Sequence, residues 1–342
     1  MRICQVISGN IPVLETGERR WGALELVQSE YKKHLIALGH TCDIKWLNEV
    51  NPKDYDIIHI HVANLCIEAQ KKGIPYIYSM HDHHSYYFGK GSSNYNEQLQ
   101  AIKGSIFSIC HAEYVVDFFD ETDKLFFLPH GVDTKFYLPN LARYINPVKH
   151  KLLMCANNGL AGNQGFDRKG FRYGIEAAKA LGLPITIVGA DANREFFEIH
   201  KDLLDYKDLT VNSSNPTEDE KIKIFEEHSI FVHPSMLEYG HPNLTLLEAA
   251  SMCIPMAATY SGTNKIEGLF RIEEITTENV VVAIRAIMED YKSIMKKMID
   301  VRKMYDWSNV VATLQNMFLS VQDFNHYPSD LVREKYFQVY NQ

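Results

Sequence analysis

Short apolar runs alternate with longer amphipathic segments along most of this chain. Residues 23–38, for example, have the length and pattern of an amphipathic helix, whereas the apolar runs before and after them have the length of strands. In the first half the predicted strands are residues 3–8, 42–47, 55–62, 75–80, 106–110 and 125–128. Strands that alternate with helices are typical of βαβ units in a parallel sheet. The first half is therefore predicted to be a doubly wound α/β domain.

The same alternation begins again after a polar segment that contains prolines, residues 139–151. The predicted strands of the second half are residues 152–156, 184–188, 209–211, 230–233 and 255–258. Thr217, with Glu220 three residues later, has the pattern of a capping box and predicts the start of a helix. With 342 residues, about twice the usual domain length, the chain is predicted to form two domains, residues 1–146 and 147–315.

Composition and charge argue against several classes of protein. The formal net charge of −8 gives no general attraction to nucleic acid or to anionic lipids. The six cysteines lie far apart and form no C-x-x-C pair, which is typical of the reducing cytosol. No apolar run approaches the ~20 residues of a membrane span, and the first run is too short for a signal peptide. We expect a folded cytoplasmic protein without a transmembrane segment.

The predicted topology locates a ligand site before any motif is considered. Ligands of open α/β sheets bind beyond the carboxyl ends of the strands. The residues expected at these ends are Gly9, His81, His130, Asn157 and Ser235. Neither half has the G-x-G-x-x-G pattern between its first strand and helix, so the usual signature of a nicotinamide or flavin site is missing. Two such domains in tandem imply a cleft between them that holds the ligand.

Residues 233–250 carry the most informative pattern. A predicted strand ends at Ser235, a loop with Gly240 follows, and a helix begins near Asn243. The free N–H groups at such a helix start form a binding site for anions. Glu248 lies among apolar residues in the first turns of this helix, which argues against a fully solvated side chain.

This segment resembles the donor-binding signature of family 4 retaining glycosyltransferases. In that family one glutamate in the loop lies near the donor sugar, and another on the helix bonds the ribose hydroxyls of the nucleotide. Glu248 matches the helix glutamate, and Glu238 is the nearest candidate for the loop glutamate, although the usual spacing falls on Gly240. The resemblance also implies donor contacts from Asn243 and Leu244 at the helix start.

The glycine-rich segment 155–171 resembles the same family, whose members place arginine and lysine here to hold the donor diphosphate. As the glycosidic C–O bond breaks, negative charge builds on the leaving phosphate, and fixed cations stabilise that state more than the ground state. Lys169, with Arg168 as its partner, is the predicted catalytic pair. Asn157 and Gly159 are expected to bind the donor, since glycine lets the backbone approach a ligand closely.

In the first half, residues 21–25 resemble the start of the first helix in this family, where Gly22 would allow close approach of a phosphate. Residues 128–136 resemble the segment that ends the N-terminal domain, with His130 in place of the more common asparagine. The resemblance implies that His130 faces the donor. The alternatives are a simple turn for the second segment, and a core position for Trp21 with only a helix start at Gly22.

The cluster at residues 80–84 contains histidine and aspartate, which are also metal ligands. No H-E-x-x-H spacing and no second cysteine cluster supplies the remaining ligands, so we predict no metal ion. The resemblance implies instead that His81 lies near the sugar and the acceptor. Asp82 would orient His81 or accept the proton of the acceptor.

As a whole, the resemblance implies an α/β protein with the GT-B fold, in which two doubly wound Rossmann-like domains face each other across a cleft. Residues 1–146 would bind the acceptor and residues 147–315 the nucleotide-sugar donor, and residues 316–342 would pack back on the first domain as helices. The implied activity is transfer of a sugar from a nucleotide-diphosphate donor to an acceptor hydroxyl with retention of anomeric configuration. No cofactor or metal is implied, and the acceptor would be a saccharide, a lipid-linked molecule or a small molecule.

Three other functions fit the same features. An epimerase of the same fold would release free nucleoside diphosphate from a UDP-sugar without an acceptor. A nucleotide-sugar-binding protein that has lost catalysis would bind the donor without cleaving it. Glycosylation of a modified DNA base would need a basic cleft surface, which the net charge of −8 disfavours.

Overall fold

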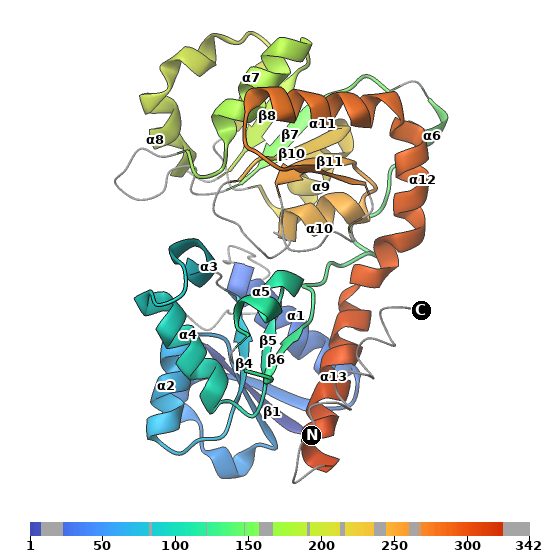
Figure 1. The fold of residues 1–342 in the computed structure, drawn as a ribbon. Coiled ribbons are helices and arrows are strands. Elements are labelled where there is room, and N and C mark those ends of the chain that lie inside the picture. Colours follow the sequence, from blue (N-terminus) through green and yellow to red (C-terminus); the bar gives the residue numbers. More distant parts are fainter. Residues whose placement is uncertain are drawn as a thin grey trace. The chain divides into compact units, whose positions relative to one another are not determined.

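Two parallel sheets, each of six strands, organise the part of the chain that the structure describes (Figure 1). The structure is a computed structural model, and the residues it describes are 1–7, 23–81, 84–120, 122–146, 148–156, 167–189, 192–212, 216–235, 244–259, 266 and 268–323. One sheet belongs to a first unit, formed by residues 1–130 and the chain from Trp307 onward. The other sheet belongs to a second unit, Gly131–Asp306.

The sheet of the first unit has the strand order β2-β1-β3-β4-β5-β6. Its strands are β1 (Arg2–Ile7), β2 (Thr41–Trp46), β3 (Ile57–Ile60), β4 (Ile77–Met80), β5 (Ser108–Cys110) and β6 (Leu125–Phe127). Its helices are α1 (Ala23–Ala37), α2 (Ala63–Lys71), α3 (His84–Phe88), α4 (Ser93–Gly104) and α5 (Glu113–Phe118), with 3-10 turns at Leu47–Glu49 and Pro52–Asp54. β3 and β4 are buried along their whole length, as expected of parallel strands with both faces covered. The order changes direction between β1 and β3, which is where a ligand of such a sheet binds.

Helix α13 (Trp307–Asp323) also belongs to the first unit, although it follows the second unit in the chain (Figure 1). It packs along α1, where the ring of Trp307 meets the ring of Tyr31 edge-on with centroids 5.7 Å apart. Farther along the helix, Gln315 Nε2 lies 2.8 Å from His40 Nε2. These contacts hold the last described helix against the unit that contains the N-terminus.

The sheet of the second unit has the strand order β12-β11-β10-β7-β8-β9. Its strands are β7 (Leu152–Cys155), β8 (Ile185–Val188), β9 (Leu209–Asn212), β10 (Ile230–His233), β11 (Met256–Thr259) and β12 (Leu269–Ile272). Its helices are α6 (Ala142–Ile145), α7 (Phe171–Leu181), α8 (Ala192–Ile199), α9 (Glu218–Glu227), α10 (Leu244–Ser251), α11 (Thr277–Glu289) and α12 (Tyr291–Val301), with 3-10 turns at Lys201–Asp205 and Arg302–Tyr305. This is the order of a nucleotide-binding Rossmann sheet, and its direction reverses between β7 and β10.

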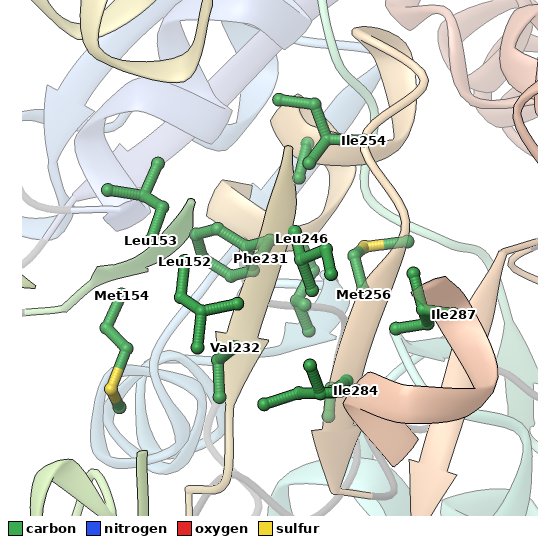
Figure 2. Close-up of a cluster of buried hydrophobic side chains, with 14 of the residues drawn as sticks. Leu152, Leu153, Met154, Phe231, Val232, Leu246, Ile254, Met256, Ile284 and Ile287 are labelled. Atoms are coloured by element: carbon green, nitrogen blue, oxygen red, sulfur yellow. The ribbon is translucent and has the colours of Figure 1, made fainter. Parts of the chain in front are cut away.

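The core of the second unit gathers side chains from strands and helices into one cluster (Figure 2). Phe231 of β10, Leu246 of α10 and Ile284 of α11 belong to it, and each is fully buried. Burying a leucine side chain contributes about 1.5–3 kcal/mol, and α10 buries both Leu246 and Leu247. Since these two leucines fix the helix in the core, they also fix the direction of Glu248 on the same helix.

The predicted α/β fold with two doubly wound sheets is confirmed. The capping box is confirmed as well, because Thr217 N donates to Glu220 Oε2 at 2.8 Å and Glu220 N donates to Thr217 Oγ1 at 3.3 Å. Strand β12 was not predicted, since its run Leu-Phe-Arg-Ile is short and half-exposed. Among the helices of the described residues, none has the length and apolar character needed to span a membrane.

Candidate functional site

The carboxyl ends of β7 and β10 form a candidate site in the second unit. The two strands are paired in parallel, so β7 ends at Cys155 on the same edge of the sheet where β10 ends at His233. The strand order reverses here, so the helices that follow the two strands leave in opposite directions and make room for a ligand. The segment that contains Lys169 follows β7, and the helix with Glu248 follows β10.

The segment with Arg168 and Lys169 is held against the end of β10. Ser235 Oγ donates a hydrogen bond to the carbonyl oxygen of Arg168 at 3.2 Å. Gly170 has a φ of +69°, and a Cβ atom there would lie 2.2 Å from the carbonyl oxygen of Pro234, so only glycine fits. Residues 168–170 and 234–235 belong to the two segments that resemble the donor-binding signature. The two segments are therefore in direct contact.

Lys169 is a buried lysine. Its residue is only 4% exposed, and burial lowers the pKa of its ammonium to about 7, with the neighbouring charge of Arg168 acting in the same direction. The start of α7 next to it is fixed by Asp167, whose carboxylate accepts from Phe171 N at 3.0 Å and from Arg172 N at 2.8 Å. A cation with so little water around it gains most when an anion enters the site.

Glu248 lies at the centre of a buried ionic network. Its carboxylate Oε1 lies 2.8 Å from Lys221 Nζ, which is also 3.0 Å from Glu218 Oε1. Tyr137 OH donates a hydrogen bond to Glu218 Oε2, and Lys221 Nζ lies 5.5 Å from the centroid of the Tyr137 ring. With two carboxylates and one ammonium, this network has an excess of negative charge.

One oxygen of Glu248 is left for a ligand. Its residue is 4% exposed, and Oε2 has no hydrogen-bond partner among the described residues. Burial raises the pKa of Glu248, and Lys221 acts in the opposite direction. Burial lowers the pKa of Lys221, but Glu248 and Glu218 outweigh it and raise that pKa overall. A buried carboxylate oxygen needs a hydrogen-bond donor, which a ligand hydroxyl can supply.

The end of β7 also contacts the helix that carries Glu248. Cys155 is the last residue of β7 and is partly exposed. Thr245 Oγ1 in the first turn of α10 lies 3.5 Å from the Cys155 carbonyl oxygen. The segments that contain Lys169 and Glu248 therefore follow the adjoining ends of β7 and β10.

Several predicted site residues lie outside the described residues, and they stay predictions. They are Gly22, Asp82, Asn157, Gly159, Glu238, Gly240 and Asn243. Leu244 is the first residue of α10 and is partly exposed. Tyr137, Glu218 and Lys221 were not predicted, because their relation to Glu248 is created only by the fold. The one sequence signal is the i,i+3 spacing of Glu218 and Lys221 on a helix.

A second cluster of polar residues lies in the first unit. His61, His81 and His111 each follow directly after a strand, namely β3, β4 and β5, and His130 comes three residues after β6. His61 Nδ1 lies 2.8 Å from His81 Nε2, and His81 Nδ1 lies 3.1 Å from His130 Nε2. His111 stacks on His130 with ring centroids 3.9 Å apart. The predicted residues His81 and His130 are thus in direct contact.

The inner histidines of this cluster are neutral. Burial is the main cause that lowers the pKa of both His61 and His81 far below the ordinary value, and the neighbouring histidines add to it. Burial likewise lowers the pKa of His59, whose Nε2 lies 2.7 Å from Ser79 Oγ, to about 3. At neutral pH these rings therefore act through hydrogen bonds rather than through charge.

Nitrogen atoms of His81, His111 and His130 lie within 4.8 Å of one another, so the described residues include one set of possible metal ligands. Sequence analysis considered only the neighbours of His81 and did not include His111. However, the rings of His81 and His130 are within 9° of parallel and their centroids are 5.3 Å apart, while two of their nitrogens are only 3.1 Å apart. The rings therefore meet at their edges and share a hydrogen bond. The absence of a metal remains a prediction.

No protein-family model matches this sequence, and no curated protein matches it in sequence. Solved structures do match in three dimensions. A glycosyltransferase from Rickettsia africae has a TM-score of 0.69 at 14% identity, over 94% of this chain and 98% of that chain. Anabaena HepE in complex with UDP has a TM-score of 0.70 at 12% identity, over 94% of this chain and 100% of that chain.

The catalytic domain of starch synthase IV from Arabidopsis thaliana, bound to ADP and acarbose, is also similar. It has a TM-score of 0.65 at 12% identity, over 93% of this chain and 99% of that chain. At such low identities the similarity shows the fold, which is that of GT-B glycosyltransferases, and the predicted fold class is confirmed. Membership of family 4 stays a prediction.

Proposed function

We propose that this protein transfers a sugar from a nucleoside-diphosphate sugar to the hydroxyl of an acceptor. The observation that carries the proposal is that a buried lysine, Lys169, and a buried carboxylate, Glu248, lie in the segments that follow the paired strands β7 and β10. A nucleoside diphosphate offers the matching groups, since its phosphates are anions and its ribose hydroxyls are donors. Two proteins of the same fold, HepE and the starch synthase, have UDP and ADP bound.

In this proposal Lys169 and Arg168 bind the diphosphate, and Glu248 Oε2 accepts a hydrogen bond from the ribose. Burial favours the neutral form of Lys169, so an entering diphosphate both attracts the proton and is stabilised by it. The first N–H groups of α10, from Leu244 onward, add the positive end of a helix. Lys221 holds Glu248 ionised and in place for the ribose.

The proposed reaction breaks the bond between the anomeric carbon and the diphosphate oxygen, and the electron pair stays on that oxygen. The acceptor oxygen forms the new bond to the same carbon, and its proton passes to the leaving phosphate. Attack on the face that the phosphate leaves retains the anomeric configuration. Lys169 and Arg168 stabilise the charge that develops on the phosphate, which lowers the barrier more than it strengthens ground-state binding. No metal ion or other cofactor is part of the proposed reaction.

For the first unit we propose contacts with the acceptor and the donor sugar. His81 and His130 lie at the carboxyl edge of its sheet, beyond β4 and β6, where ligands of such sheets bind. Asp82 is proposed to assist His81, and Gly22 to allow approach of the diphosphate. The acceptor is proposed to be a saccharide, a lipid-linked molecule or a small molecule.

The first experiment is a thermal-shift and turnover panel of UDP-, GDP-, ADP- and dTDP-sugars with the full chain. We expect one nucleotide class to raise the melting temperature, and this shift to disappear in Glu248→Gln. Glu289→Gln, an exposed glutamate on α11, is the matched control and should keep the shift. If no nucleotide sugar binds, the proposed function is wrong.

A second measurement separates the enzyme from its alternatives. With the selected donor, a pool of saccharide, lipid-linked and small-molecule hydroxyl compounds should yield a glycosylated product, and proton NMR of that product gives its anomeric configuration. Release of free nucleoside diphosphate that needs no acceptor would indicate an epimerase instead. Tight donor binding without cleavage would indicate a binding protein.

A further inference from the structure

Gln5 and three histidines form one continuous row of hydrogen bonds in the first unit. His61 Nε2 bonds to Gln5 Oε1, His61 Nδ1 lies 2.8 Å from His81 Nε2, and His81 Nδ1 lies 3.1 Å from His130 Nε2. Gln5 is a buried residue of β1, and the three histidines follow β3, β4 and β6. The row therefore runs from the middle of the sheet along its carboxyl edge.

The direction of every bond in this row follows from its first member. The amide oxygen of Gln5 can only accept, so His61 must donate from Nε2. A neutral imidazole has one N–H, so His61 Nδ1 accepts, and His81 donates to it from Nε2. Because His81 donates from Nε2, its Nδ1 has no proton and accepts from His130 Nε2. The proton of His130 is then on Nε2, and the lone pair of this ring is on Nδ1.

The Gln5 oxygen is the atom within hydrogen-bond distance of His61, and the Gln5 amide nitrogen has no hydrogen-bond partner among the described residues. His111, stacked on His130, has the other tautomer, because its Nδ1 lies 2.7 Å from the carbonyl oxygen of Leu128 and must donate there.

We infer that Gln5 sets the tautomer of the whole row, so that His61, His81 and His130 each carry their ring proton on Nε2. His81 uses both ring nitrogens within the row and is a positioning residue. Gln5 and His61 position it in turn, and none of the three takes a proton from a ligand. The consequence for the transferase rests on the proposed function: the row would hold His81 and His130 in fixed orientations at the carboxyl edge of the sheet.

A metal ion on His81, His111 and His130 is the competing use of the same atoms. An ion would need a lone pair from each ring, and His81 and His130 instead direct one N–H and one lone pair at each other along a shared edge. His111 lies over the face of His130, so its ring does not share that edge. The hydrogen-bonded row accounts for the observed orientation of His81 and His130 without an ion.

Two-bond proton–nitrogen NMR correlation on the full chain, labelled with ¹⁵N-histidine, measures these tautomers directly. At neutral pH we expect the proton on Nε2 in His61, His81 and His130, and on Nδ1 in His111. Single histidine-to-glutamine variants assign the signals. A proton on Nδ1 of His81 would overturn the inference, and so would stoichiometric zinc binding that removes the His81 and His130 ring N–H signals.

Gln5→Met tests the role of the glutamine, because methionine has a similar volume but no acceptor oxygen. We expect mixed tautomers at His61, His81 and His130. Gln28→Met is the matched control: Gln28 is equally buried and donates to the Val6 carbonyl oxygen, so it should leave the three tautomers unchanged. Unchanged tautomers in folded Gln5→Met, or equal changes in both variants, would contradict the inference.

A second variant and a measurement of turnover complete the test of Gln5. If Gln5→Met does not fold, Gln5→Glu keeps an accepting oxygen and should show the original tautomers; a change there would count against the inference. The spectra need neither donor nor acceptor, so they are independent of the proposed transferase activity. Where that activity is measured, Gln5→Met should lower turnover about tenfold, as expected for one lost hydrogen bond, and leave donor affinity unchanged.

Discussion

Lys221 Nζ lies 2.8 Å from Glu248 Oε1, and both side chains are largely removed from water. The pair joins α9 to α10 across 27 residues of sequence, so it connects the capped helix that starts at Thr217 with the helix that carries the predicted ribose-binding carboxylate. Because Glu218 shares the same ammonium, loss of Lys221 would remove the cation that the buried Glu248 and the partly exposed Glu218 have in common. This relationship makes Lys221 a support of the site as well as of the fold.

Lys221→Met is expected to reduce the free energy of unfolding by about 3–5 kcal/mol, the usual cost of leaving a buried charge unpaired. The pKa of Glu248 would rise further in this variant, because burial already raises it and Lys221 is the main cause that acts in the opposite direction. Denaturant unfolding measures the first effect. Lys223→Met, two residues away and exposed on the same helix, should change stability little. If Lys221→Met and Lys223→Met had the same free energy of unfolding, the ion pair between Lys221 and Glu248 would not contribute to stability.

Glu248→Gln is expected to weaken donor binding by about 10- to 100-fold, since a hydrogen bond to a charged group contributes roughly 1.5–3 kcal/mol. The amide keeps the size of the side chain and removes its charge, so the fold should tolerate it better than the loss of Lys221. Calorimetric titration with the nucleotide sugar measures the dissociation constant. If Glu248→Gln binds like the wild type, Glu248 does not contact the ribose.

Lys169→Met is expected to lower turnover by about 10²–10³-fold, the loss found when one group that stabilises developing charge is removed. Donor binding should fall as well, because the ammonium also binds the ground-state diphosphate, but turnover should fall further since the charge on the phosphate is greatest in the transition state. Steady-state kinetics separate kcat from KM. Lys179→Met, an exposed lysine on α7, controls for a simple loss of charge in the same unit. Normal kcat in Lys169→Met would refute its assigned role.

The pH dependence of donor binding follows from the same lysine. Burial lowers the pKa of Lys169 from 10.5 to about 7, so above pH 7 the free site holds the neutral amine. The bound diphosphate favours the ammonium, so binding takes up a proton and affinity falls up to about tenfold per pH unit above pH 7. Calorimetry in buffers of different ionisation enthalpy counts this proton. This uptake of a proton on donor binding should disappear in Lys169→Met.

The same shift affects stability with the opposite sign. Between pH 7 and 10.5 the unfolded chain holds a proton on Lys169 that the folded chain has released. Because the unfolded state then binds more protons, this group makes the free protein more stable as pH rises through that window. Unfolding of the wild type and of Lys169→Met at several pH values isolates the contribution. Identical pH profiles of stability would contradict the lowered pKa.

Most strands and several of the helices, such as α1 and α9, could be predicted because each is encoded by a local pattern. Buried parallel strands such as β10, Ile-Phe-Val-His, are short apolar runs between helical segments, and this pattern needs no knowledge of distant contacts. β12 could not be predicted in this way, since only Ile272 of its four residues is buried. The GT-B fold was predicted from a resemblance of residues 155–171 and 233–250 to a known family. The local pattern correctly places these segments after strands β7 and β10.

The candidate site was only half predictable. Lys169 and Glu248 lie in segments that resemble a known signature, whereas Tyr137 reaches this network from 81 residues before Glu218. No local pattern encodes such a contact, because it depends on how the helices pack. The histidine row had a readable signal: His61 and His81 each follow a predicted or observed strand end directly. His81 and His130 were predicted as site residues, whereas His61, which joins His81 to Gln5, was not.

Gly170 and Gly182 allow one more comparison, since both have left-handed backbone in the same unit, with φ of +69° and +64°. A Cβ at Gly182 meets nothing within 4 Å, so Gly182→Ala should cost about 1–2 kcal/mol of stability from backbone strain alone. A Cβ at Gly170 would lie 2.2 Å from the backbone oxygen of Pro234, which cannot move like the end of a side chain. Gly170→Ala should therefore cost about 1–3 kcal/mol more, the range for overpacking.

Gly170→Ala should also weaken donor binding, because the clash separates the Lys169 segment from the end of β10. Denaturant unfolding and nucleotide-sugar titration of the two alanine variants measure both effects. Gly182→Ala is expected to bind the donor like the wild type, since Gly182 lies at the far end of α7. If both variants lose the same stability and both keep donor affinity, the contact between Gly170 and Pro234 does not hold Lys169 in the site.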